Sequence, residues 1–120
     1  MRLLKCFLVF DGHEFSRAAD GGGKPNVSWE CIREVMLPFT PRRGMRFSGI
    51  LPARDEDLVW TDADTTENDD WGWRANLVSY DVSREAFVAR FFQVSIQIPW
   101  ESTPESLAAR YPGWLFIRNL

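Results

Sequence analysis

Residues 2–10 form a largely apolar stretch that constrains the fold more than any other feature of this 120-residue chain. In a strand, successive side chains point to opposite faces, so a half-exposed strand alternates between apolar and polar residues. Here one face carries Leu3, Phe7 and Val9, with Lys5 as the exception, and the other carries Leu4, Cys6, Leu8 and Phe10. Apolar residues on both faces are typical of a central strand covered on both sides. The sequence therefore predicts a sheet with an interior strand close to the N-terminus.

Two further segments, 73–82 and 85–98, give clear strand patterns and are joined by a tight turn. In the second of them, one face carries Val88, Phe92, Val94, Ile96 and Ile98. We expect this strand to lie centrally in the sheet, with Phe92, Val94 and Ile96 in the core.

Residues 27–37 fit two patterns. They alternate as a strand would, with Arg33 as the exception, and parts of the segment also satisfy helical spacing. We favour the strand because Pro25, Pro38 and Pro41 crowd the segment and no strong helix cap precedes it.

The other predicted elements are short. Residues 45–51, 58–60 and 114–117 have the composition of strands. Thr103 followed by Pro104 predicts the start of a brief helix, because Thr is a good N-cap and Pro suits the first helical position. Together these elements predict a single α+β domain over the whole chain, with a mainly antiparallel sheet or sandwich of about six strands and one or two short helices.

The composition is that of an ordinary folded domain, since 45% of the residues are hydrophobic and 26% are charged. Cys6 and Cys31 are the only cysteines, and the apolar surroundings of Cys6 favour buried free thiols over the alternative of a single disulfide. The N-terminal run resembles a signal peptide, but Lys5 interrupts it and leaves only a short apolar stretch. Because no segment approaches the length of a membrane span, we expect a cytoplasmic protein that does not bind membranes.

Eight of the seventeen acidic residues fall between positions 55 and 70, a stretch without Lys or Arg that we call the acidic segment. The whole chain carries a net charge of −3, so the acidic segment carries −8 and the remaining residues sum to +5. A negative electrostatic field beside aromatic side chains that can anchor a partner favours recognition of a basic partner. The predicted partner-binding residues are Asp55, Glu56, Asp57, Trp60, Asp62, Asp64, Glu67, Asp69, Asp70 and Trp71.

The alternative for this segment is a solvated loop whose tryptophans pack inward. Trp71 and Trp73 are two residues apart, so in a strand both rings would lie on the same face. The sequence leaves open whether these two residues belong to the core or to the surface.

The acidic segment lacks the spacing of a calcium-binding loop. Counting from Asp62, Glu67 occupies the position that requires glycine, and Trp73 occupies the position of the bidentate Glu. We therefore predict no metal site and no cofactor. An irregular, low-affinity metal site, or a pair of carboxylates acting in hydrolysis, remains the alternative.

The chain offers few candidate catalytic residues. His13 is the only histidine, and we interpret it as a solvent-exposed turn residue rather than a general base. Residues 21–24 read Gly-Gly-Gly-Lys, but Pro25 follows where a phosphate-binding loop requires Ser or Thr. We therefore predict no catalytic residues and interpret the glycine run as a surface loop.

Arg42, Arg43 and Arg46 form a basic turn, and arginines so close together suit a phosphate group or a nucleic-acid backbone. More often such a turn is solvated or pairs with the protein's own acids. The negative net charge of the chain argues against nucleic acid as a partner.

These observations favour a small protein-interaction domain, of the kind found among inhibitors and immunity-type proteins, that binds a basic protein partner through the acidic segment. We favour a binding protein over an enzyme. One alternative is a small-ligand or carbohydrate-binding domain whose exposed tryptophans stack on the ligand. The other is a carboxylate- or metal-dependent hydrolase. The sequence leaves the identity of the partner and the oligomeric state open.

Overall fold

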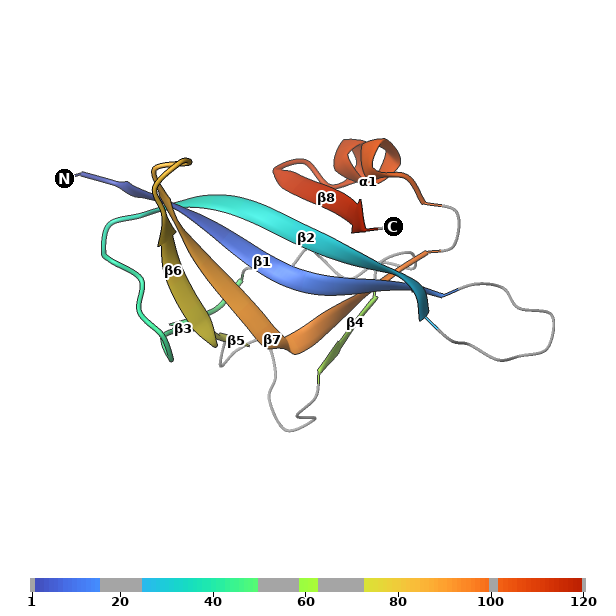
Figure 1. Ribbon diagram of the computed structural model, residues 1–120, viewed down its shortest axis with the longest axis horizontal. Helices are drawn as coiled ribbons and strands as arrows, with labels where there is room; N and C mark the ends of the chain where they lie inside the picture. Colours follow the sequence, from blue (N-terminus) through green and yellow to red (C-terminus); the bar gives the residue numbers. More distant parts are fainter. Residues whose placement is uncertain (1, 16–24, 50–58, 63–72, 100–101, 120) are drawn as a thin grey trace.

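The computed structural model describes residues 2–15, 25–49, 59–62, 73–99 and 102–119. This part of the chain contains eight strands and one helix (Figure 1). In chain order they are β1 (Leu4–Phe15), β2 (Pro25–Leu37), β3 (Arg46–Phe47), β4 (Val59–Asp62), β5 (Trp73–Arg74), β6 (Leu77–Asp81), β7 (Ala86–Ile98), α1 (Pro104–Arg110) and β8 (Trp114–Asn119).

Six of these strands form one mixed sheet in the order β4-β7-β1-β2-β8, and β6 also pairs with β7. β1 and β7 run parallel, whereas the other described pairs run antiparallel. β3 and β5 form a separate two-stranded sheet. The fold is therefore mostly β with one short helix in the described residues, which agrees broadly with the expected α+β class.

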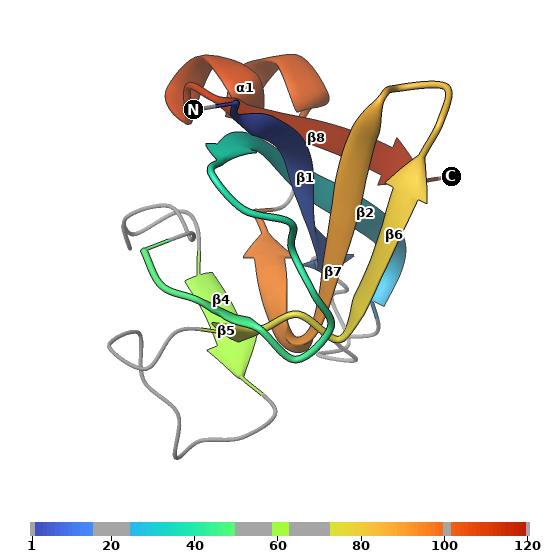
Figure 2. The same ribbon diagram turned by 90° about the vertical axis from the view of Figure 1, so that its left-hand side faces the viewer.

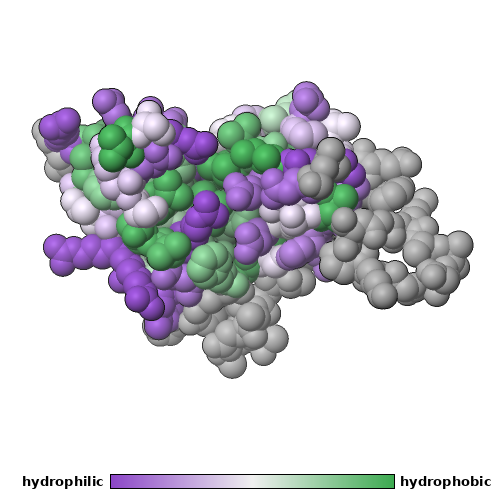
Figure 3. Space-filling view, viewed as in Figure 1, coloured by the Kyte–Doolittle hydropathy of each residue, from purple (hydrophilic) through white to green (hydrophobic). Residues whose placement is uncertain are grey.

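β1 lies in the interior of the sheet, as its apolar run predicts, between β2 and β7. Cys6, Leu8 and Phe10 on its inner face are fully buried. The outer face is less covered than predicted, because Val9 is buried but Phe7 is only partly buried. On the face of the molecule seen in Figure 3, hydrophobic and hydrophilic residues lie side by side.

β7 bends in the middle because it contains extra residues relative to β1 (Figure 1). Phe10 of β1 pairs with Phe91 of β7. The next residue of β1, Asp11, pairs with Ser95, so residues 92–94 have no counterpart on β1. Side chains alternate between the two faces of a strand. When an odd number of residues is inserted, each later side chain therefore points to the face opposite to the one expected without the insertion.

Because of the bend, the residues of β7 that face the core differ in part from those predicted. Phe91 is fully buried and Phe92 is 56% exposed, so the prediction that Phe92 lies in the core is wrong. Val94 and Ile96 are buried as predicted, because the bend moves the core face of β7 from Phe91 to Val94, Ile96 and Ile98. The side chain of Asn76 stabilises the bend, since its Oδ1 accepts a hydrogen bond from the Phe92 backbone N–H at 2.7 Å.

The strand predicted over 73–82 is divided in the structure into β5 and β6. At the division, the Ala75 N–H donates to the carbonyl of Met45 at 2.9 Å, in the small sheet. The next residue, Asn76, donates its N–H to the carbonyl of Arg90 at 2.9 Å, in the large sheet. The chain therefore passes from the small sheet to the large sheet between Ala75 and Asn76.

Two other strand predictions have different outcomes. The segment over 27–37 is a strand, as favoured, and forms most of β2. Of the strand predicted over 45–51, Arg46 and Phe47 form β3, and residues 50 and 51 lie outside the described residues.

The helix begins directly after Thr103, as predicted. Thr103 Oγ1 accepts a hydrogen bond from the Ser106 N–H at 3.1 Å, and Ser106 Oγ accepts one from the Thr103 N–H at 3.1 Å. This capping box satisfies two N–H groups at the start of the helix. The helix packs through the buried Leu107, and the Tyr111 ring at its end lies 6.2 Å from the Phe116 ring of β8.

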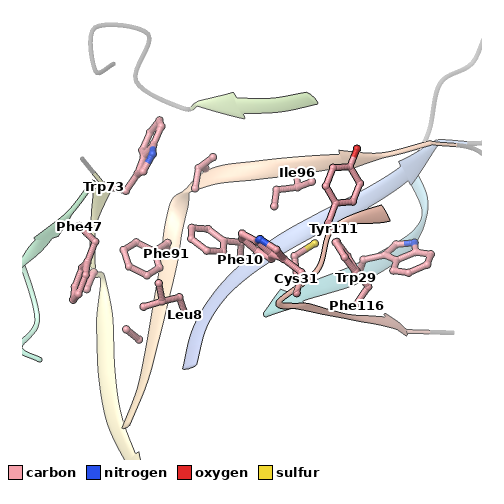
Figure 4. Close-up of a cluster of buried hydrophobic side chains, with 14 of the residues drawn as sticks. Leu8, Phe10, Trp29, Cys31, Phe47, Trp73, Phe91, Ile96, Tyr111 and Phe116 are labelled. Atoms are coloured by element: carbon pink, nitrogen blue, oxygen red, sulfur yellow. The ribbon is translucent and has the colours of Figure 1, made fainter. Parts of the chain in front are cut away.

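Aromatic rings make up much of the core (Figure 4). Phe10 and Phe91 stack with their centroids 4.9 Å apart, and Trp114 lies 5.7 Å from Phe10. Phe47 of the small sheet meets Phe91 edge-on at 5.8 Å. Rings at these separations interact favourably beyond the burial of their surface. The small sheet is therefore joined to the large one by side-chain packing.

Candidate interaction site

Most of the predicted partner-binding residues lie outside the described residues. Trp60 and Asp62 belong to β4, whose backbone is described. That the acidic segment is exposed and binds a partner stays a prediction. The residues outside the described ranges are Asp55, Glu56, Asp57, Asp64, Glu67, Asp69, Asp70 and Trp71.

The chain on either side of the acidic segment is held together at one place. β3 precedes the segment and β5 follows it, and the two strands pair with Phe47 opposite Trp73. The Gly44 N–H donates to the Ala75 carbonyl at 2.7 Å, which extends the pairing. Directly opposed residues of an antiparallel pair have their Cα atoms roughly 5 Å apart. The intervening chain therefore leaves and returns at a common base, which we define as β3 and β5.

Two aromatic side chains fix this base to the core. Phe47 is 8% exposed and packs against Phe91, and Trp73 is 2% exposed within the same cluster. Full burial of a large apolar side chain contributes about 1.5–3 kcal/mol. Trp73 is thus a core residue, whereas Trp71 lies outside the described residues.

The middle of the intervening chain is also attached to the large sheet. Of the short strand predicted over 58–60, residues 59 and 60 belong to β4, and residue 58 lies outside the described residues. β4 pairs antiparallel with the second half of β7. The paired residues are Val59 with Gln97, Trp60 with Ile96, Thr61 with Ser95, and Asp62 with Val94. Part of the acidic segment is therefore held by backbone hydrogen bonds at an edge of the sheet.

Arginines gather in the base of the acidic segment and in the turn just before it. Arg42, Arg43, Arg46 and Arg74 are all exposed, and Arg46 lies directly opposite Arg74 in the β3–β5 pair. Like charges directly opposite each other destabilise a strand pair. Within the described ranges, Arg42 and Arg43 form no ion pair. Positive charge is therefore concentrated where the chain enters and leaves its most negative stretch.

His13 lies in a strand, so its interpretation as an exposed turn residue is wrong. β1 continues to Phe15, and His13 is partly buried on the outer face. Its neighbours in the sheet are Ser28 of β2 and Gln97 of β7. Glu14 is adjacent in sequence and points to the opposite face, so it does not orient the imidazole ring.

Sequence reasoning missed one buried carboxylate. Glu14 is 2% exposed, and its Oε2 accepts hydrogen bonds from Trp29 Nε1 at 2.9 Å and from Arg118 Nε at 3.2 Å. The available signal was the alternation of β1, which places Glu14 on the same face as Phe10. The Glu14 carboxylate therefore links β1 to β2 and β8. Because it is buried from solvent, it is not placed to exchange protons with a substrate.

The two cysteines are buried free thiols, as favoured from the sequence. Burial raises the pKa of Cys6 to about 11. Burial, together with the negative charges of Asp11 and Glu30, raises the pKa of Cys31 to about 12. Both thiols are therefore protonated near neutral pH, and a protonated thiol is a poor nucleophile.

The described residues lack two further features. No group of three or more His, Cys, Asp and Glu side chains is placed there to hold a metal ion. Nor does any helix in these ranges have the length and apolar character needed to cross a membrane.

No protein family, curated protein or solved structure matches this chain. Its function is therefore inferred from its own residues.

Proposed function

We propose that this protein is a small binding domain that recognises a basic protein partner through the acidic segment. The observation that carries this proposal is the charge distribution, with −8 in residues 55–70 and +5 in the rest of the chain. A local field of this kind attracts a partner of opposite charge and steers its approach. Inhibitors and immunity-type proteins that block a basic target belong to this physical class.

The attachment of the neighbouring chain supports the proposal. Phe47 and Trp73 fix the base to the core, and β4 pairs with β7. Binding residues often lie in loops that a rigid scaffold positions. Holding such a loop at several points reduces the conformational entropy that is lost when the partner binds.

The exposed arginines near the base restrict how a basic partner can orient itself on the proposed surface. A basic partner is attracted over the acidic segment and repelled near Arg42, Arg43 and Arg74, which are exposed. Such an arrangement favours one orientation of the partner and disfavours others.

The proposal is tested by affinity capture from the source cell with three baits, followed by identification of the captured proteins by mass spectrometry. The first bait is the wild-type protein. The second, the segment variant, carries Asp57→Asn, Asp64→Asn, Asp69→Asn and Asp70→Asn. The third, the charge control, carries Asp11→Asn, Glu34→Gln, Glu85→Gln and Glu105→Gln, all at exposed positions.

Both variants change the net charge equally, so they separate local recognition from a general charge effect. We expect the wild type and the charge control to capture the same basic protein and the segment variant to lose it. Capture of the same basic protein by the segment variant would show that the acidic segment is not the binding surface.

A further inference from the structure

A groove of about 410 Å³ opens between the start of β1 and the turn that joins β6 to β7. Both lie at the end of the molecule that faces the viewer in Figure 2. Leu4 and Phe87 line the groove from the two strands, and Arg2, Lys5 and Arg84 lie around it. Its volume falls within the range of small-molecule sites. It shares no residue with β3, β4 or β5.

The groove is predominantly cationic. Lys5 Nζ lies 3.6 Å from Glu34 Oε1, and both side chains are well exposed. Arg84 Nε lies 3.6 Å from Asp81 Oδ2, also near the surface. Exposed pairs of this kind are weak, and Arg2 forms no ion pair within the described ranges. The charged lining residues are Arg2, Lys5, Arg84 and Glu85.

Aromatic and aliphatic side chains form the rest of the lining. Tyr80 and Phe87 meet edge-on with their centroids 5.0 Å apart. Tyr80 is 53% exposed and Met36 is 50% exposed, so both present apolar surface to solvent. Exposed aromatic surface beside arginine is the combination that recognises a flat anion, because the guanidinium group binds the charged end and the ring packs against the body.

The turn at the rim is held in a strained conformation. Glu85 has a φ of 51° and is the one residue other than glycine with positive φ in the described part of the chain. Asp81 Oδ1 supports the turn by accepting hydrogen bonds from the Ser83 N–H at 3.0 Å, the Ser83 hydroxyl at 2.7 Å and the Arg84 N–H at 3.3 Å. Strained residues held by their surroundings cluster at ligand sites. Here the strained turn positions Arg84.

We propose that this groove binds a small organic anion with an aromatic body. Its carboxylate, sulfonate or phosphate end meets Arg84, Lys5 and Arg2, and its ring packs against Tyr80 and Phe87. This site is independent of the proposed function, because it takes a small anionic molecule whereas the acidic segment takes a basic protein.

The test uses the fluorescent probe anilinonaphthalene sulfonate and its uncharged analogue N-phenylnaphthylamine. We expect the sulfonate to bind the wild-type protein at one site and to shift the amide NMR signals of residues 2–5 and 80–87. Arg84→Gln is expected to weaken sulfonate binding by about tenfold, since one charge-assisted hydrogen bond is lost. The same change should leave the binding of the uncharged probe almost unaltered. Tyr80→Ala should weaken both probes.

Two further variants keep the test decisive. Arg43→Gln removes an exposed arginine outside the groove and should change neither probe's binding. Arg2→Gln removes a cation that makes no ion pair in the described part of the chain, so it tests the groove even if Arg84→Gln unfolds the turn. Signal shifts confined to other residues, or equal effects of Arg43→Gln and Arg2→Gln on the sulfonate, would overturn the proposal.

Discussion

The indole N–H of Trp29 donates a hydrogen bond to Oε2 of Glu14 at 2.9 Å inside the core. The same oxygen accepts a second bond, from Arg118 Nε at 3.2 Å. Burying a carboxylate costs free energy unless it is paired and hydrogen-bonded, and here it is both. The three residues belong to β1, β2 and β8, so this contact joins the two ends of the chain.

Breaking this contact from one side should destabilise the fold. Arg118→Met keeps most of the side-chain stem but leaves the Glu14 carboxylate with one donor, and we expect a loss of about 1–3 kcal/mol in the free energy of unfolding. Urea denaturation measures this loss. Adding Glu14→Gln removes the buried charge, so the double variant should lose less than the sum of the single changes. Simple additivity would contradict the predicted coupling.

The bend in β7 predicts opposite outcomes for two adjacent phenylalanines. Phe91 is fully buried, so Phe91→Ala should cost about 3–5 kcal/mol. Phe92 is 56% exposed, so Phe92→Ala should cost less than about 1 kcal/mol. Chemical denaturation of the two variants compares these costs. Equal losses would mean that the register of β7 is wrong.

The strained turn predicts a stabilising substitution. Glu85 adopts a φ of 51°, which costs a residue with a Cβ roughly 1–2 kcal/mol and costs glycine almost nothing. Glu85→Gly should therefore raise the free energy of unfolding by about 0.5–1 kcal/mol, after the greater flexibility of glycine in the unfolded chain is deducted. Thermal unfolding measures the change. Glu105→Gly, in the first turn of α1, is the control and should destabilise.

The buried thiols predict a loss of stability at high pH. Burial raises the pKa of Cys6 to about 11 and that of Cys31 to about 12, from an ordinary value of 9.0. Between pH 9.0 and these values the folded chain holds more protons than the unfolded chain, so the free energy of unfolding falls as the pH rises. The contribution is complete below pH 9.0. The double variant Cys6→Ala and Cys31→Ala should show a smaller fall over this range, and an unchanged slope would contradict the prediction.

The long elements of the fold were predictable because their signals are local. β1 follows from its two apolar faces, and the helix start follows from Thr103 and Pro104. The bend in β7 was not predictable, because an inserted residue carries no signature in the alternation itself. Phe92 fits the core face in sequence. In the structure it is the first of three residues without a counterpart on β1, and its N–H donates to Asn76 Oδ1.

The site was predictable in part. The charge of the acidic segment is a property of composition and needs no structure. The common base of β3 and β5 depends on the pairing of Phe47 with Trp73, which are far apart in sequence. The groove beside Arg84 depends in the same way on the start of β1 meeting the β6–β7 turn. Contacts between distant segments have no periodic signal, so sequence reasoning misses them.

The most direct measurement of the central claim is the dissociation constant for an arginine-rich peptide, determined over a range of salt concentrations. It is measured for the wild-type protein, the segment variant and the charge control. We expect wild-type binding to weaken steeply with salt, because exposed charges are screened. Without salt, the segment variant should bind at least about tenfold more weakly than the wild type, and the charge control should bind nearly as well as the wild type. Equal dissociation constants for the segment variant and the charge control would contradict recognition by the acidic segment.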